Sequence, residues 1–167
     1  MIIVAKFGGS SLADAVQMRK TQKILLDNPG RKFVVPSAPG KRFSEDDKVT
    51  DLLYTFYQAV QYGSDYNAVF AKIRERFVSM RDELNLDLPI EDALARVLED
   101  VLGGASQDYA ASRGEYLNGM LLASLMGWDF IDAADVIFFD KRAKYDSKKT
   151  MEVLSKELAA HEHAVIP

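Results

Sequence analysis

The chain has 167 residues, 48% of them hydrophobic and 28% charged, with a formal net charge of −4. This composition is ordinary for one soluble globular domain with a sizeable core, and the acidic balance argues against a nucleic-acid partner. There is no cysteine and there are two histidines, which excludes disulfides and thiolate chemistry and disfavours a histidine-rich metal site. Neither a signal peptide nor an apolar run of the ~20 residues that span a membrane is recognisable, so we expect a cytoplasmic protein.

The first twelve residues contain the most informative pattern. The apolar run Ile2–Ala5 predicts a buried parallel strand, Lys6 follows its end, and Gly8 and Gly9 precede a helix-compatible segment. A strand, a glycine-rich turn and a helix start present backbone N–H groups to an anion. Glycine lets the backbone approach a phosphate closely, and a lysine beside the turn supplies a point charge.

A purely structural interpretation fits the same residues. Lys6 is then a charge at a strand end, and Ser10 or Ser11 is a helix N-cap, with Asp14 at capping-box spacing from Ser11. The segment has the spacing of neither a P-loop nor a dinucleotide-binding fingerprint. Taken alone, this stretch leaves both interpretations open.

Hydrophobic periodicity predicts the remaining elements in chain order. Helices are expected over 12–26, 49–60, 66–84, 90–102, 106–126 (one helix or a pair) and 147–160. Strands are expected over 32–36, 128–131, 136–139 and 163–166. Gly103 and Gly104 are interpreted as a helix C-cap and connector, and Ser147 as an N-cap. Strands alternating with helices predict an α/β fold with a parallel sheet that binds ligands at the carboxyl ends of its strands.

Several motifs together resemble those of the aspartate kinases, within the amino-acid kinase family. They are Lys6–Ser11, Ser37–Lys41, Lys48–Leu53, Ser112–Glu115, Phe130–Asp135 and Ala164–Pro167. The resemblance implies a three-layer α/β/α sandwich with a mainly parallel sheet, here incomplete. It also implies that ATP phosphorylates the β-carboxylate of L-aspartate, the first step toward lysine, threonine and methionine. ATP would be a substrate accompanied by Mg²⁺, with no tightly bound cofactor, and the full-length enzyme could form a homo-oligomer.

The resemblance assigns a phosphate-binding role to the first motif. Lys6 would be the catalytic residue that steadies the transferring phosphoryl group, and it would also bind ATP phosphate. The backbone N–H groups of Gly8, Gly9 and Ser10 would hold phosphate oxygens. No protein ligand for a metal is assigned.

The resemblance assigns the binding of the amino-acid substrate to three further residues. Ser37 and Thr50 would face aspartate, and Glu115 would pair with its α-ammonium group, a charge-assisted bond. Without the resemblance, Thr50 is simply a polar residue at a helix start, and Glu115 lies at capping-box spacing from Ser112. Lys41 is left out of this assignment as a turn lysine, and Arg113 receives no catalytic role.

Residues 1–167 are thus expected to be the N-terminal, amino-acid-binding part of an amino-acid kinase domain. The motif that would hold the α-carboxylate, the loops that would hold the nucleotide base, and the regulatory ACT domains are absent. We therefore expect no ATP turnover by these residues alone. Two alternatives remain: a non-catalytic module that binds aspartate, and a different amino-acid kinase, such as one acting on glutamate derivatives.

Overall fold

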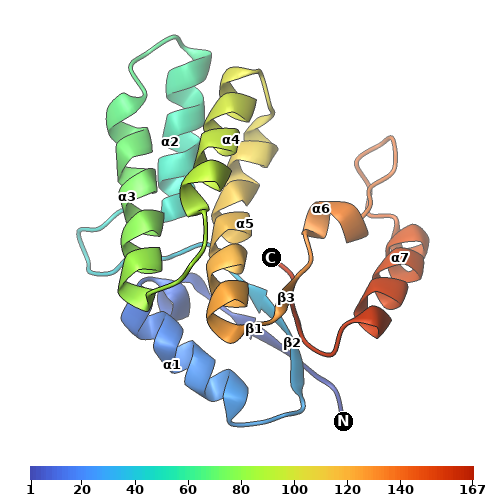
Figure 1. Ribbon diagram of the computed structural model, residues 1–167. Helices are drawn as coiled ribbons and strands as arrows, with labels where there is room; N and C mark the ends of the chain where they lie inside the picture. The colour runs from blue at the N-terminus through green and yellow to red at the C-terminus, as the bar shows by residue number, and fades with distance from the viewer.

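The computed structural model describes residues 1–167 as a parallel four-stranded sheet with helices on both faces (Figure 1). The strands lie in the order β1-β2-β4-β3, with bounds β1 (Ile3–Phe7), β2 (Arg31–Pro36), β3 (Asp129–Phe130) and β4 (Ala164–Val165). The helices are a 3₁₀ turn (Gly9–Leu12), α1 (Ala15–Leu26), α2 (Val49–Gln61), α3 (Asn67–Leu84), α4 (Ile90–Leu102), α5 (Gln107–Met126), α6 (Ala133–Val136) and α7 (Ser147–Ala160). The α/β class with a parallel sheet is therefore confirmed.

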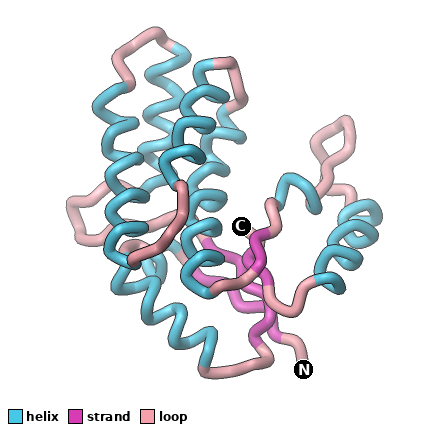
Figure 2. The backbone as a smooth tube through the Cα atoms, viewed as in Figure 1, coloured by secondary structure: helices cyan, strands magenta, loops and turns pink.

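Two apolar cores lie on opposite faces of this sheet, as the alternation of side chains along a strand requires. On one face, Val34 of β2 and Val165 of β4 join a core of 24 buried residues built mainly from α1–α5. On the other face, Phe33 and Ala164 pack beneath α6 and α7. Figure 1 shows α2–α5 side by side as a bundle, and Figure 2 shows the strands gathered between this bundle and the α6–α7 side.

The first strand is an edge strand rather than a fully buried one. Its residues alternate between half-buried and exposed, and Ile2 and Val4 are 64% and 62% exposed. The predicted strand over Ile2–Ala5 is therefore confirmed. Its predicted burial is wrong for one face, on which Val4 is exposed. The run of apolar residues gave no indication of this, because an edge strand packed on one face has the same composition.

Two local predictions near the end of the chain are wrong. The segment 136–139 forms no strand: Val136 ends α6, and Phe139 makes only an isolated antiparallel bridge with Tyr145. The N-cap of α7 is Asp146, whose carboxylate accepts from Lys149 N, and Ser147 is the first helical residue. The Gly103 C-cap of α4 is confirmed.

A histidine joins the end of α7 to the edge strand β3. His161 Nδ1 lies 2.7 Å from Asp129 Oδ2, and its Nε2 lies 3.2 Å from Glu157 Oε1. The hydrogen bond to Asp129, followed by that to Glu157, raises the pKa of His161. Because the folded pKa is the higher one, the stabilisation is complete below the unfolded value of about 6.5 and disappears as pH rises through the folded pKa.

We therefore expect His161→Gln to lower the melting temperature at pH 5.5 and to change it little at pH 8.5. Thermal unfolding of both proteins at the two pH values measures this difference, and His163, present in both, cancels from the comparison. An equal loss at both pH values would contradict the ionic role.

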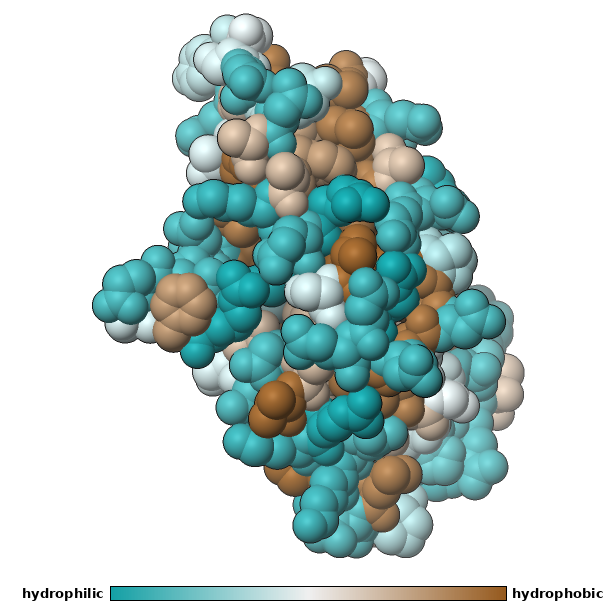
Figure 3. Space-filling view, turned by 60° about the vertical axis from the view of Figure 1, so that its left-hand side comes forward, coloured by the Kyte–Doolittle hydropathy of each residue, from teal (hydrophilic) through white to brown (hydrophobic).

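One face of the molecule is mainly polar. In the view of Figure 3, hydrophilic residues cover most of the face, and hydrophobic residues form small, separate groups. None of the helices combines the length and the apolar character that crossing a bilayer requires.

Candidate active site

The strands end along one edge of the sheet, and the loops that follow them line two pockets. The chain crosses the sheet in one direction from β1 to β2 and in the opposite direction from β3 to β4. Parallel α/β sheets form a ligand crevice outside the strand ends at such a reversal. Here the reversal lies between β2 and β4. Ser37 directly follows β2, and Pro167 lies two residues after the end of β4.

The first pocket, which we call the loop pocket, has a volume of about 460 Å³. It brings together segments that lie far apart in the sequence, and its lining is Gly9, Ser10, Ser37, Ala38, Pro39, Gly40, Lys41, Lys48, Thr50 and Glu115. Five of the seven residues assigned from the sequence line it: Gly9, Ser10, Ser37, Thr50 and Glu115. The two glycine-containing turns and the candidate amino-acid ligands thus share one cavity.

The two turns contact each other through their backbones. Gly40 N donates to Gly9 O at 2.9 Å. A Cβ atom on Gly9 would lie 2.8 Å from Ala38 O, and one on Gly40 would lie 2.8 Å from Gly9 C. Only residues without a side chain allow this approach, so both glycines are required by close packing rather than by an unusual φ.

The start of α2 closes another side of the loop pocket. Val49 N donates to Pro39 O at 3.2 Å, which fixes the helix start against the second turn. Thr50 and Lys48 are adjacent to Val49 and both line the cavity. Lys48 and Lys41 bring two cationic side chains to a pocket whose one acidic lining residue is Glu115, an arrangement that favours anionic ligands.

Glu115 enters from the middle of α5. The helix is continuous over Gln107–Met126, and Ser106 caps it by accepting from Tyr109 N at 3.1 Å. The alternative interpretation of Ser112 and Glu115 as a capping box is therefore wrong. A Cβ on Gly114 would lie 2.8 Å from Ala38 Cβ, so the missing side chain lets α5 approach the second turn.

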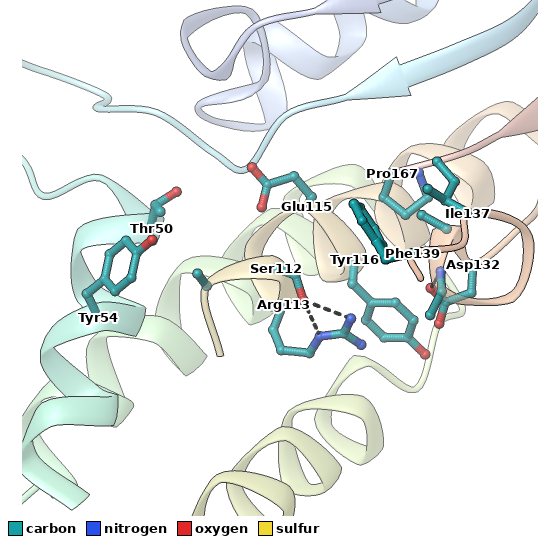
Figure 4. Close-up of a pocket in the computed structure, with 13 residues that line it drawn as sticks. Thr50, Tyr54, Ser112, Arg113, Glu115, Tyr116, Asp132, Ile137, Phe139 and Pro167 are labelled. Atoms are coloured by element: carbon teal, nitrogen blue, oxygen red, sulfur yellow. Dashed lines mark hydrogen bonds between the residues drawn. The ribbon is translucent and has the colours of Figure 1, made fainter. Parts of the chain in front are cut away.

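Glu115 has no partner among the ion pairs of the chain. It lines both pockets, and Figure 4 shows its side chain extending from α5 toward the loop that follows β2. An unpaired carboxylate in a cavity is available to a cationic group of a ligand.

The remaining assigned residues, Lys6 and Gly8, lie outside the pocket lining. Lys6 is an exposed residue of β1 paired in register with Val35, and Gly8 is the residue before the 3₁₀ turn. The sequence interpretation also missed two lining residues, Lys41 and Lys48. Both belong to motifs that it had quoted, Ser37–Lys41 and Lys48–Leu53, and Lys41 had been set aside as a turn lysine, so membership of these motifs was the available signal.

The second pocket, the wide pocket, has a volume of about 630 Å³ and shares Thr50 and Glu115 with the first. Figure 4 shows Thr50 and Tyr54 of α2 on one side and Asp132, Ile137, Phe139 and Pro167 on the other.

Arg113 lies between these two walls. Its Cζ is 4.5 Å from the ring centroids of both Tyr109 and Tyr116. Burial, followed by a hydrogen bond to Asp100, raises the pKa of Tyr109 to about 12, so its hydroxyl stays protonated and donates.

Fold and site together define an α/β protein with a crevice, lined by two lysines and one glutamate, at the carboxyl edge of a parallel sheet. The crystal structure of Clostridium acetobutylicum aspartate kinase is 48% identical in sequence, with a TM-score of 0.96 over 99% of this chain and 38% of that one. Aspartokinase 3 of Bacillus subtilis (strain 168) is 35% identical over 136 residues, which cover 78% of this chain and 30% of the relative. By sequence and fold, the chain belongs to the aspartate kinase family.

More distant structures share the fold. Escherichia coli aspartokinase III, in complex with aspartate and ADP, matches 99% of this chain and 40% of its own with a TM-score of 0.78 at 22% identity. The same enzyme in complex with lysine and aspartate gives the same values. No protein-family model matches the chain. The chain spans between 30% and 40% of the length of these relatives.

Proposed function

We propose that the chain forms the aspartate-binding and phosphate-binding part of an aspartate kinase. The reaction would transfer the γ-phosphoryl group of ATP to the β-carboxylate of L-aspartate, giving 4-phospho-L-aspartate and ADP. The observation that supports this most is the loop pocket, where Gly9 and Ser10 meet Ser37, Thr50 and Glu115. The relatives named above are aspartate kinases, and one of them is a complex with aspartate and ADP.

The reaction would depend on neutralising the charge of the two substrates and on positioning them, rather than on a general base. The attacking carboxylate is already ionised, so bringing it to the phosphoryl group and neutralising the charge of both anions dominates the barrier. Lys41 and Lys48 supply positive charge at the pocket. We expect Mg²⁺ to arrive with ATP, bound to its phosphate oxygens.

Within this proposal the assigned residues have separate roles. The N–H groups of Gly8, Gly9 and Ser10 would bind phosphate oxygens. Ser37 and Thr50 would face the aspartate, and the Thr50 hydroxyl would donate to one of its carboxylates. Glu115 would accept from the α-ammonium group. Lys6, at the end of β1, would extend toward the transferred phosphoryl group.

Residues 1–167 would then be the amino-acid-binding part of the kinase domain. We propose that groups outside these residues hold the nucleotide base and the aspartate α-carboxylate. The product would feed lysine, threonine and methionine synthesis in the cytoplasm.

Ligand selectivity tests this proposal directly. We expect isothermal titration calorimetry to give tighter binding of L-aspartate than of succinate, which has the same two carboxylates and no ammonium group. Loss of a charge-assisted bond of about 1.5–3 kcal/mol predicts at least a tenfold difference. Equal affinities for L-aspartate and succinate would contradict the role given to Glu115, and tighter binding of L-glutamate would favour a different amino-acid kinase.

A further inference from the structure

The turn that follows β2 is held through its carbonyl oxygens. Ser37 O accepts from Asn118 Nδ2 at 2.7 Å, Pro39 O accepts from Val49 N at 3.2 Å, and Gly40 O accepts from Arg76 Nη1 at 2.8 Å. Carbonyl oxygens carry partial negative charge and would repel an anion. Hydrogen-bond donors from α2, α3 and α5 bind three of the four carbonyl oxygens of residues 37–40, and so offset this negative charge.

Arg76 of α3 is the most heavily bonded of these donors. It is 2% exposed, and its Nη2 donates to Asp46 Oδ2 at 2.5 Å and to Asp47 O at 3.1 Å. Hydrogen bonding from Arg42 and the positive charge of Arg76 hold the pKa of Asp46 well below its usual range. A buried guanidinium needs such a carboxylate, and the pair fixes the direction of the remaining N–H groups.

Asn118 holds the other end of the same turn. It is fully buried in α5, one helical turn after Glu115, and its Nδ2 faces Ser37 O. Its Oδ1 is buried without a hydrogen-bond partner. The hydrogen bond to Ser37 is therefore the one side-chain contact that fixes the orientation of this amide.

The constraint extends to the first turn. Gly40 N donates to Gly9 O, and the backbones of the two glycines are too close for any side chain between them. A shift of Gly40 must therefore move Gly9, and Arg76 acts on both walls of the loop pocket through one carbonyl.

We propose that Arg76 and Asn118 are positioning residues that hold the Ser37–Gly40 turn, and through it Gly9, in the arrangement that receives an anionic ligand. Neither residue lines the pocket, so neither touches the ligand itself. The identity of the ligand as aspartate rests on the proposed function, whereas the anchoring of the turn does not.

Amide hydrogen exchange of the 167-residue chain tests the anchoring without a ligand. Arg76→Met and Asn118→Leu should each speed exchange of the Gly40 and Val49 amides at least tenfold, and Arg76→Lys should have a smaller effect because one ammonium replaces two donor nitrogens. Arg81→Met is the matched control: Arg81 is also on α3 and paired with a carboxylate, Glu91, but it contacts α4. Exchange at Gly40 and Val49 equal to that of the control, at matched global stability, would overturn the proposal.

Binding separates positioning from general stability. We expect the dissociation constant for L-aspartate to rise at least tenfold in Arg76→Met and to stay unchanged in Arg81→Met, even where both variants lose the same unfolding free energy. Wild-type affinity in Arg76→Met with a loosened turn would overturn the positioning role. Failure of the unsubstituted chain to distinguish L-aspartate from succinate would instead contradict the proposed function, and the exchange result would still decide whether the turn is anchored.

Discussion

Gly40→Ala is expected to disrupt the loop pocket and to destabilise the chain by about 1–3 kcal/mol, the usual cost of overpacking. The new Cβ would lie 2.8 Å from Gly9 C, 2.9 Å from Gly9 O and 3.0 Å from Ser10 N. All three are backbone atoms, so no side-chain rotation relieves the contact, and the two turns must separate. Urea unfolding measures the loss of stability, and calorimetry with L-aspartate measures the loss of the site.

Gly8→Ala is the matched control in the same motif. A Cβ at Gly8 meets no atom within 4 Å, and φ is −78°, a value that alanine adopts freely. Its backbone N–H is retained. We expect its unfolding free energy to stay within about 0.5 kcal/mol of the original. A Gly8→Ala variant as unstable as Gly40→Ala would show that flexibility, rather than close packing, is what the glycine turn requires.

Glu115→Gln is expected to weaken L-aspartate binding about tenfold while the fold is kept. Glutamine has the same shape, but it replaces a charge-assisted bond to the ammonium group, worth about 1.5–3 kcal/mol, by a neutral one. Succinate, which lacks that group, should lose no affinity and should bind at least as well to the variant, because one repulsive charge is removed. Calorimetric titration with both ligands measures the change in selectivity.

Glu99→Gln provides the charge control for this experiment. Glu99 is an exposed residue of α4 that lines neither pocket. The substitution changes the net charge by the same amount at a distance from the site. Equal weakening of L-aspartate binding in both variants would attribute the effect to overall charge and would contradict a direct contact with Glu115.

The longer helices and most strands could be predicted because their signals are local. Apolar residues of α2 and α4 recur at helical spacing, and each glycine turn directly follows a strand. The strand prediction for residues 136–139 was wrong because a short run of branched and aromatic residues is as compatible with a strand as with the end of a capped helical turn. There Asp132 accepts from Ala134 N and starts α6 instead.

The candidate site was predictable only where its residues belong to recognisable motifs. The assigned residues Ser37, Thr50 and Glu115 meet in one pocket, but the side chains that hold the turn do not appear in any motif. Arg76 and Asn118 lie inside the long helices α3 and α5, 36 and 81 residues from the carbonyls that they bind. Such contacts depend on tertiary packing, which no local pattern specifies. The position of Lys6, exposed and outside the pocket lining, likewise came only from the structure.

Mapping of amide chemical shifts during titration with L-aspartate tests the central claim most directly. The loop pocket predicts that the largest changes fall on its lining, at Gly9, Ser10, Ser37, Gly40, Thr50 and Glu115. It also predicts no change around the acidic surface pocket of Asp82, Asn85 and Asp87, which serves as an internal reference. Largest changes outside the crevice at the strand ends, with the loop pocket unaffected at saturating L-aspartate, would contradict the account.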